Sequence, residues 1–317
     1  MDATAPALIL RRPEPGRLAR LFDNKTFLIV ACLTPALGLL IVFLAYPLGL
    51  GLWLAFTDAQ IGGGGHFVGL ENFISLANDS VFWLTVFQTI FYTFVATAGK
   101  FALGLWLALL LNHNMRFSSI IRAVILLPWI VPTVLSAIAF WWIYDPQFSI
   151  ISYVLVDKLH WLKGNIDFLG TPWHARFSLI AANIWRGIPF VAISLLAGLQ
   201  TISPSLYEAA MLDGASSWQR FRFVTAPMLM PILAVVLTFS VLFTFSDFQL
   251  VYAITRGGPF DTTQLMATLA FQRGIPGGQL GEGAAIAVAM IPFLVASTMI
   301  SYFALSRRKW QQGEANE

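Results

Sequence analysis

Three ionisable residues lie inside long apolar stretches of this sequence, and they are Lys100, Arg186 and Asp247. A charged side chain at the centre of a membrane span costs about 2.5–3.5 kcal/mol on insertion scales, so such residues usually face a cavity or a partner group. Planar hydrogen-bonding side chains beside aromatic faces are the groups that recognise sugars. We therefore interpret six residues as a candidate solute pathway: Asn183, Trp185, Arg186, Asp247, Phe248 and Gln249.

A structural role for the same residues stays open. In that interpretation Arg186 and Asp247 neutralise one another between two helices, and Trp185 faces lipid. Both interpretations apply to Asp247 and Gln249. Lys100 is interpreted as structural, because it lies nearer the cytoplasmic half of its span.

Covalent chemistry is not predicted for this chain. Gly99 and Lys100 precede Phe101 inside an apolar stretch, so they cannot form a phosphate-binding loop. The four histidines are scattered over predicted loops without metal-ligand spacing. We therefore expect no catalytic residue, no metal site and no cofactor, and we expect a partner to supply the energy.

The composition is that of a polytopic membrane protein. Of the 317 residues, 57% are hydrophobic and only 11% are charged, whereas soluble domains carry about 25% charged residues. A single cysteine, Cys32, excludes an intrachain disulfide. Six apolar runs are each long enough to cross a hydrocarbon core of about 30 Å, and they predict an all-α fold with six transmembrane helices at about 27–56, 82–111, 120–143, 177–199, 227–251 and 283–305.

The distribution of basic residues predicts the orientation and the domain limits. With the N-terminus inside, the cytoplasmic segments hold twelve Lys and Arg and the outer segments hold five. This bias predicts that both termini are cytoplasmic. We expect a disordered basic arm over 1–25, a membrane domain over 26–306 and a cytoplasmic tail over 307–317, and the basic residues are spread too widely to indicate nucleic-acid binding.

A polar stretch from Ser203 to Pro231 separates the fourth and fifth predicted spans. Ser203 followed by Pro204 predicts a helix start, and Ser205-x-x-Glu208 offers a competing start one step later. Gly214 is suited to the left-handed cap that ends a helix. Ser216-x-x-Gln219 predicts a second short helix running toward Pro227. Helices of about two turns are unstable alone, so another surface must pack against them.

The spacing in this stretch resembles the EAA loop of ABC importer permeases. Glu208-Ala209-Ala210 is followed after three residues by Gly214, and after nine more by Val224-x-Ala226-Pro227. Val224 and Ala226 replace the Ile and Leu of the family pattern. Asp213-Gly214-Ala215 resembles the carbohydrate branch of the family. Further landmarks of sugar permeases follow in their expected order: Gly69-Leu70-Glu71-Asn72-Phe73, Arg122-Ala123-Val124 with Leu127-Pro128, and Thr255-x-Gly257-Gly258-Pro259.

The resemblance implies a bacterial inner-membrane permease subunit with the type I importer fold. It implies coupling through a loop at about 200–227, with Glu208, Ala209, Ala210, Asp213 and Gly214 contacting an ATPase. The implied partners are a second homologous permease subunit, two cytoplasmic ATPase subunits that bind ATP and Mg, and a periplasmic or lipid-anchored solute-binding protein. The implied cargo is a sugar or sugar derivative, such as an oligosaccharide, a glycoside or a polyol, carried by alternating access.

Two other functions compete with this interpretation. A stand-alone secondary transporter would need coupling-ion carboxylates near the middle of the membrane, and the chain offers only Asp247 there. A membrane enzyme would need a nucleophile with a base, or paired acids, and the spans contain no such set.

Overall fold

The computed structural model describes residues 25–113 and 117–313 and divides the chain into two units, Met1–Trp53 and Leu54–Glu317. The expected basic arm therefore lies almost wholly outside the described residues. The expected tail is partly described, because the last helix continues from the membrane domain to Gly313.

The first unit contains one long helical stretch, built from α2 (Lys25–Leu40), a π turn η1 (Ile41–Ala45) and α3 (Tyr46–Leu54). Together these elements make a candidate span of 30 residues. At 1.5 Å per residue the stretch is about 45 Å long, which exceeds the hydrocarbon thickness. Within this unit none of the side chains in α2 is buried. Its apolar surface is therefore left to be covered by groups outside the unit.

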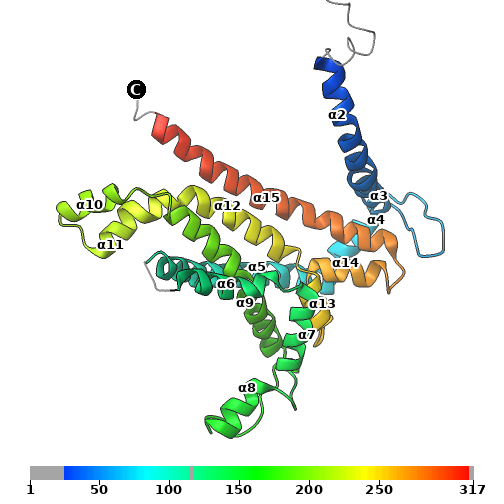
Figure 1. Cartoon of the computed structure of the whole chain (residues 1–317). Coiled ribbons are helices and arrows are strands. Elements are labelled where there is room, and N and C mark those ends of the chain that lie inside the picture. Colours follow the sequence, from blue (N-terminus) through cyan, green and yellow to red (C-terminus); the bar gives the residue numbers. More distant parts are fainter. Residues whose placement is uncertain (1–24, 114–116, 314–317) are drawn as a thin grey trace, which may run out of the picture. The chain divides into compact units, whose positions relative to one another are not determined.

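The second unit is built from helices throughout its described residues, apart from one antiparallel bridge between Thr57 and Phe67 (Figure 1). Its elements follow in this order: α4 (Glu71–Ala77), α5 (Ser80–Leu111), α6 (Ser118–Ile130), α7 (Thr133–Ile143), α8 (Ile150–Tyr153), η2 (Val154–Lys158), α9 (Pro172–Leu199), α10 (Pro204–Leu212), α11 (Ser217–Arg220), η3 (Phe221–Thr225), α12 (Ala226–Phe245), α13 (Gln249–Ile254), α14 (Met266–Gly274) and α15 (Leu280–Gly313).

The all-helical fold and its spans agree with the sequence prediction. Within the described residues, five helical stretches are long and apolar enough to cross a membrane, and a bent pair of helices makes a sixth candidate. Local signals explain where the longer helices start. The Asp79 carboxylate accepts a hydrogen bond from the Val81 amide at 2.8 Å and caps α5. Pro172 occupies the first turn of α9, where its missing N–H costs nothing.

The third predicted span is broken rather than continuous. α6 and α7 are bent by 89° at a short break between Ile130 and Thr133. Val131 has an extended conformation with ψ 130°, and Pro132 follows it. Proline disfavours the helical region for the residue before it and offers no amide hydrogen to continue the helix. Pro128, by contrast, lies inside α6 without ending it.

Small residues allow α5 and α9 to pack closely at the centre of the second unit. Gly99 and Gly104 on α5 face Ile184 and Val191 on α9. A Cβ atom added to Gly104 would lie 2.7 Å from Cγ1 of Val191, which is closer than real Cβ contacts allow. Membrane helices gain contact area when small residues let their backbones approach.

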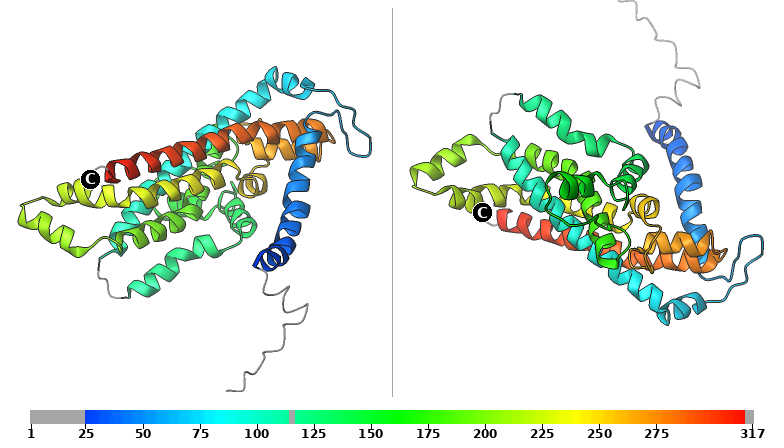
Figure 2. Two further views of the ribbon diagram at one scale, coloured as in Figure 1. Left: turned by 90° about the horizontal axis from the view of Figure 1, so that it is seen from above. Right: turned by 90° about the horizontal axis from the view of Figure 1, so that it is seen from below.

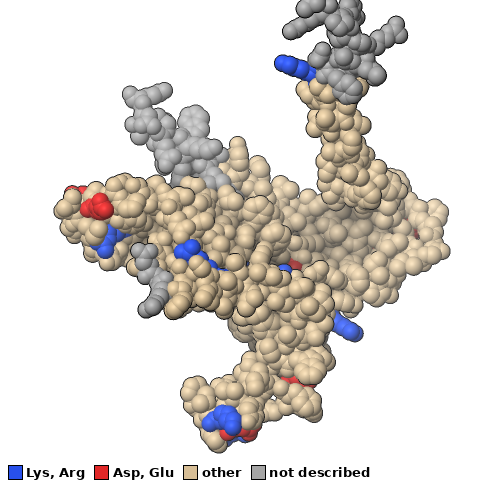
Figure 3. Space-filling view, viewed as in Figure 1, with Lys and Arg blue, Asp and Glu red and all other residues tan. Residues whose placement is uncertain are grey.

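Segments predicted to share the cytoplasmic side lie at one end of the second unit. The end of α5, the start of α6, the α10–α11 hairpin and the C-terminal end of α15 lie toward one end in both views, whereas α4 and α14 lie at the opposite end (Figure 2). Charged side chains gather near α10–α11 and near α8, and the visible surface between them is mostly uncharged (Figure 3). The side of the membrane that each end faces stays a prediction.

Candidate coupling hairpin and polar cavity

The predicted EAA stretch forms a helical hairpin of α10 and α11. α10 begins at Pro204 with Ser203 as its N-cap, as the first of the two competing starts predicts. The Ser203 hydroxyl does not cap a backbone amide and instead lies 2.8 Å from the Ser205 hydroxyl. Tyr207 anchors the hairpin, because its hydroxyl lies 3.1 Å from the Thr225 hydroxyl.

Gly214 ends α10 as predicted. Its φ is +78°, in the left-handed region that favours glycine. The Ala215 amide donates to the Ala210 carbonyl at 2.9 Å, and the Gly214 amide donates to the Met211 carbonyl at 3.0 Å. These two bonds form the Schellman motif that satisfies the last carbonyls of a helix.

The second helix of the hairpin begins with the predicted capping box. The Ser216 hydroxyl accepts from the Gln219 amide at 3.3 Å, and the Gln219 side chain accepts from the Ser216 amide at 2.7 Å. The helix does not stop before Pro227. The π turn η3 joins α11 to α12, so one candidate span runs from Ser217 to Ile254. The hairpin is therefore rigidly continuous with a membrane span.

The tip of the hairpin exposes apolar side chains to solvent. Leu212 is 90% exposed, and Met211 and Trp218 are also exposed. Of the residues predicted to contact an ATPase, Glu208, Ala209, Asp213 and Gly214 are exposed and Ala210 is half-buried. Large exposed apolar patches are typical of protein-docking sites, so these side chains make the tip a candidate docking site.

A polar cavity of about 30 Å³ lies between α5, α6, α9 and α12. It brings together three of the six residues predicted for the solute pathway, Asn183, Arg186 and Asp247. Its full lining comprises Lys100, Trp129, Asn183, Arg186, Gly187, Phe190, Ser240, Phe243, Thr244 and Asp247. A cavity of this size holds only water-sized molecules, so a sugar does not fit in this conformation.

Asp247 is held by neutral donors rather than by a cation. Its Oδ2 accepts from the Tyr92 hydroxyl at 2.9 Å and from Nδ2 of Asn183 at 2.8 Å. Its Oδ1 accepts from the Leu250 amide at 3.3 Å, at the start of α13. The carboxylate is buried with 9% of the residue exposed. Burial of a carboxylate requires such hydrogen bonds.

The ion pair considered between Arg186 and Asp247 does not form. Among the residues that the structure describes, no ion pair joins Asp247 to Arg186 or to Lys100. The Arg186 Nε is buried without a hydrogen-bond partner in the part of the chain that the structure describes. Its guanidinium carbon lies 5.7 Å from the centroid of the Trp129 ring. Trp129 was not among the six predicted pathway residues, because nothing in the sequence indicates that α6 packs beside Arg186.

Lys100 belongs to this cavity, although the sequence suggested a separate structural role. The residue is 5% exposed, and its ammonium donates to the Thr244 hydroxyl at 2.5 Å. Gly187 on α9 leaves room for the lysine stem, because an added Cβ there would collide with it. Lysine is rare in the middle of a membrane span, and this rarity could have placed Lys100 among the predicted pathway residues.

The other three predicted pathway residues lie outside the cavity. Trp185 is 44% exposed and packs edge-on against Phe140, with ring centroids 5.2 Å apart. Phe248 stacks on Tyr252 at 5.1 Å, and Gln249 is exposed at the start of α13. α12 ends at Phe245 and α13 begins at Gln249, so the helix is interrupted between them. Asp247 lines the cavity from this interruption, whereas Gln249 is exposed and does not line the cavity.

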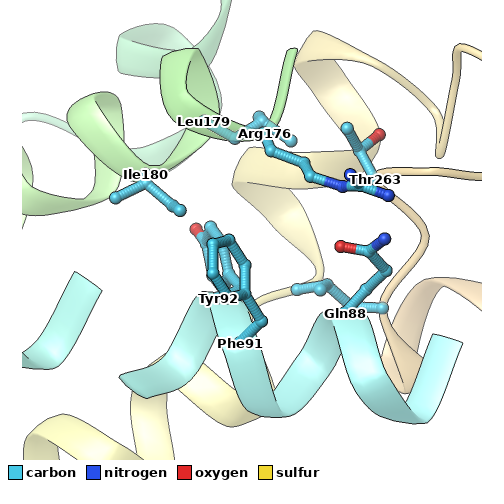
Figure 4. Close-up of a pocket in the computed structure, with 8 residues that line it drawn as sticks. Gln88, Phe91, Tyr92, Arg176, Leu179, Ile180 and Thr263 are labelled. Carbon is cyan, nitrogen blue, oxygen red and sulfur yellow. The ribbon is translucent and has the colours of Figure 1, made fainter. Parts of the chain in front are cut away.

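Tyr92 also borders a second, smaller pocket of about 10 Å³ nearer the loop before α14. Figure 4 shows the Arg176 side chain reaching from α9 toward Thr263, with Gln88 and Tyr92 below it on α5. The Arg176 Nε donates to the Thr262 carbonyl at 3.0 Å. The Gln88 amide nitrogen is buried without a partner in the described residues. Tyr92 thus connects the lining of this pocket to Asp247 of the polar cavity, to which its hydroxyl donates.

The corner at the opposite end from the hairpin is fixed by charges. Arg273 on α14 forms ion pairs with Asp79 at the start of α5 and with Glu282 in the first turn of α15. Burial opposes the charged form of Arg273, but the two carboxylates outweigh it and raise the pKa of the guanidinium above its ordinary value. α14 is also held by apolar packing, because its Met266 and Leu269 are buried.

Comparisons with known proteins identify relatives over most of the chain. The profile of a family described as "Binding-protein-dependent transport system inner membrane component" matches residues 100–311. The trehalose/maltose transport system permease protein MalF of Thermococcus litoralis is 34% identical over 84% of this chain and 89% of its own length. The sulfoquinovosyl glycerol transport system permease protein SmoG of Agrobacterium fabrum is 33% identical over 89% of this chain and 91% of its own length.

A solved structure has the same fold. A chain of a bacterial ABC transporter involved in the import of the acidic polysaccharide alginate superimposes with a TM-score of 0.76, covering 91% of this chain and 99% of that chain at 24% sequence identity.

Proposed function

Because the chain belongs to the family of binding-protein-dependent transport system inner membrane components, we propose that it is the permease subunit through which an ABC importer carries a sugar. Its membership makes it a multi-pass inner-membrane permease that has no ATPase site of its own and needs no cofactor. ATP-driven work therefore has to reach it from ATPase subunits of the transporter complex.

The cargo assignment is supported by the names of the relatives and by the polar cavity. The two relatives described above are permeases for trehalose or maltose and for sulfoquinovosyl glycerol. The cavity offers an amide, a guanidinium and a carboxylate beside the rings of Trp129, Phe190 and Phe243. This is the combination of planar hydrogen-bonding groups and aromatic faces that suits a sugar or sugar derivative.

The observation that carries the proposal is the exposed α10–α11 hairpin. It is closed by a Schellman motif and a capping box, it exposes Leu212 at its tip, and it continues without a break into α12. A rigid lever of this kind transmits the movement of a docked ATPase to a span that lines the polar cavity. Alternating access then exposes that cavity to one side of the membrane at a time.

In this proposal the transporter consists of four subunits, which are this chain, a second homologous permease and two ATPase subunits. The second permease completes the pathway, and the ATPase subunits dock on the hairpins of the two permeases. An external solute-binding protein delivers the sugar. The hairpin, the α5–α6 connection and both termini face the cytoplasm, as the twelve-to-five bias of basic residues predicts.

Affinity purification and ligand screening test this assembly. A tagged chain expressed from its chromosomal locus is expected to retain a second permease and an ATPase when extracted in mild detergent. The solute-binding protein of the same system is expected to bind a sugar in a thermal-shift screen. Recovery of the chain alone, or a binding protein that takes amino acids and no sugar, would contradict the proposal.

A further inference from the structure

We propose that the sugar carried by this permease bears an acidic group, such as a carboxylate, phosphate or sulfonate, which Arg186 and Lys100 receive. The inference rests on the proposed function, because it specifies the cargo of the same polar cavity. It follows from the net charge of the cavity lining and from the hydrogen bonds of the charged side chains, some of whose donors have no partner among the described residues.

The lining carries an excess of positive charge. Lys100 and Arg186 are the cations that line the cavity, and Asp247 is the only acid among the lining residues. Uncompensated charge inside a membrane span is costly and normally pairs with an opposite charge. One carboxylate cannot neutralise two cations, so the cavity favours an anion.

Asp247 is already satisfied and is not directed at either cation. Tyr92, Asn183 and the Leu250 amide supply three hydrogen bonds to its two oxygens. A carboxylate that served mainly to neutralise Arg186 would lie in direct contact with the guanidinium, as paired arginines and carboxylates do. Among the described residues, the arrangement leaves both cations without a carboxylate in direct contact.

Arg186 presents unused donors toward the cavity. Its guanidinium carbon lies 5.7 Å from the centre of the Trp129 ring, within the range of a cation–π contact. The Nε atom is buried without a hydrogen-bond partner among the described residues. The planar fork of a guanidinium matches the two oxygens of a carboxylate, phosphate or sulfonate.

Lys100 supports the same ligand from the facing helix. Its ammonium group has three donors, and the structure assigns one of them to Thr244. The Thr244 hydroxyl in turn donates to the Ser240 carbonyl at 2.5 Å, so it accepts from the lysine and orients it. The two remaining donors are available to an oxyanion placed between α5 and α9.

The present volume of about 30 Å³ admits a water molecule but not a sugar. The acidic group therefore reaches Arg186 only in a conformation in which the surrounding helices have moved apart. Transport itself requires such a change, since the pathway must open to each side in turn.

Matched sugars test the inference at the binding protein first. The panel pairs methyl glucoside, maltose and trehalose with their uronate, 6-phosphate and 6-sulfonate counterparts, and binding is measured by calorimetry. Capture of an acidic member, at least tenfold tighter than its neutral match, is expected. Capture of neutral sugars only would overturn the inference and leave the sugar-permease function standing. Capture of no sugar in the panel would contradict both.

Charge-removing variants then test the cavity in the complete transporter in proteoliposomes, with the captured sugar as labelled cargo. Loss of a charged hydrogen bond predicts an apparent KM about 10- to 100-fold higher for R186Q, and R186K is expected to recover part of that loss. R176Q removes a cation from the same helix outside the cavity, and it is expected to change KM less than threefold.

The effect of R186Q on the acidic sugar is compared with its effect on the neutral match of that sugar. R186Q is expected to raise the KM for the acidic cargo by about tenfold more than it raises the KM for the neutral match. An equal loss for both sugars would make Arg186 a structural residue and overturn the inference. If R186Q does not assemble, R186K and K100M are measured with the same pair, and unchanged KM values for the acidic sugar in both variants would also overturn it.

Discussion

Leu212 at the tip of the α10–α11 hairpin allows the docking function to be separated from the stability of the subunit. Its side chain is 90% exposed, so Leu212→Ser removes almost no packing within the chain, and surface changes of this kind alter stability by about 0.5 kcal/mol or less. A leucine that becomes buried in a partner groove contributes about 1.5–3 kcal/mol. The expected loss of affinity for the ATPase is therefore roughly 10- to 150-fold.

The assay titrates the purified ATPase onto the permease pair in nanodiscs and measures the dissociation constant and ATP hydrolysis. Phe260→Ser is the matched control, because Phe260 is 85% exposed on the loop between α13 and α14. The control is expected to bind the ATPase like wild type. An L212S protein that binds within threefold of wild type would refute the docking role, and one that loses thermal stability would show that Leu212 packs within its own subunit.

Three further predictions concern topology, the hairpin turn and helix packing. In a Cys32→Ser background, a cysteine at Ser217 is expected to label from inside and one at Asp261 from outside, and the opposite pattern would refute the orientation. Gly214→Pro is incompatible with a φ of +78°, so uptake is expected to be lost at normal membrane levels, whereas normal uptake would show that the turn is dispensable. Gly104→Leu forces extra volume between α5 and α9 and is expected to destabilise the subunit by about 1–3 kcal/mol, and an unchanged thermal unfolding midpoint would contradict this packing.

The spans and the hairpin could be predicted because their causes are local. Apolar runs of sufficient length specify membrane helices whatever packs around them. Ser203 with Pro204, Gly214 and the Ser216–Gln219 pair each satisfy backbone groups within a few residues, so the limits of α10 and the start of α11 follow from the sequence.

Features that depend on three-dimensional contact were not predictable in the same way. The π turn η3 carries α11 into α12, although Pro227 suggested a stop. Proline in the first turn of α12 lacks only an amide hydrogen, and the wider π turn accommodates it. The bend at Val131 and Pro132 had a sequence signal, but its size of 89° depends on what packs against α6 and α7.

The candidate cavity shows the same limit. Asn183 and Arg186 lie three residues apart, a spacing that places them on one helix face, and both line the cavity. The partners of Asp247 were not predicted, because they depend on the rotation of α5 and α12 about their axes. Tyr92 gave no signal, since a tyrosine in an apolar run is unremarkable until its hydroxyl is seen to donate to Asp247.

ATP-dependent uptake in proteoliposomes distinguishes an ATP-driven importer from a secondary transporter. The two permeases and the ATPase are reconstituted with ATP inside the vesicles and with the sugar-loaded binding protein outside. Sugar is expected to accumulate only when both ATP and the binding protein are present, and accumulation is expected to be lost with Gly214→Pro. Sugar accumulation by this chain alone, driven by an ion gradient without ATP, would show instead that the chain is a stand-alone secondary transporter.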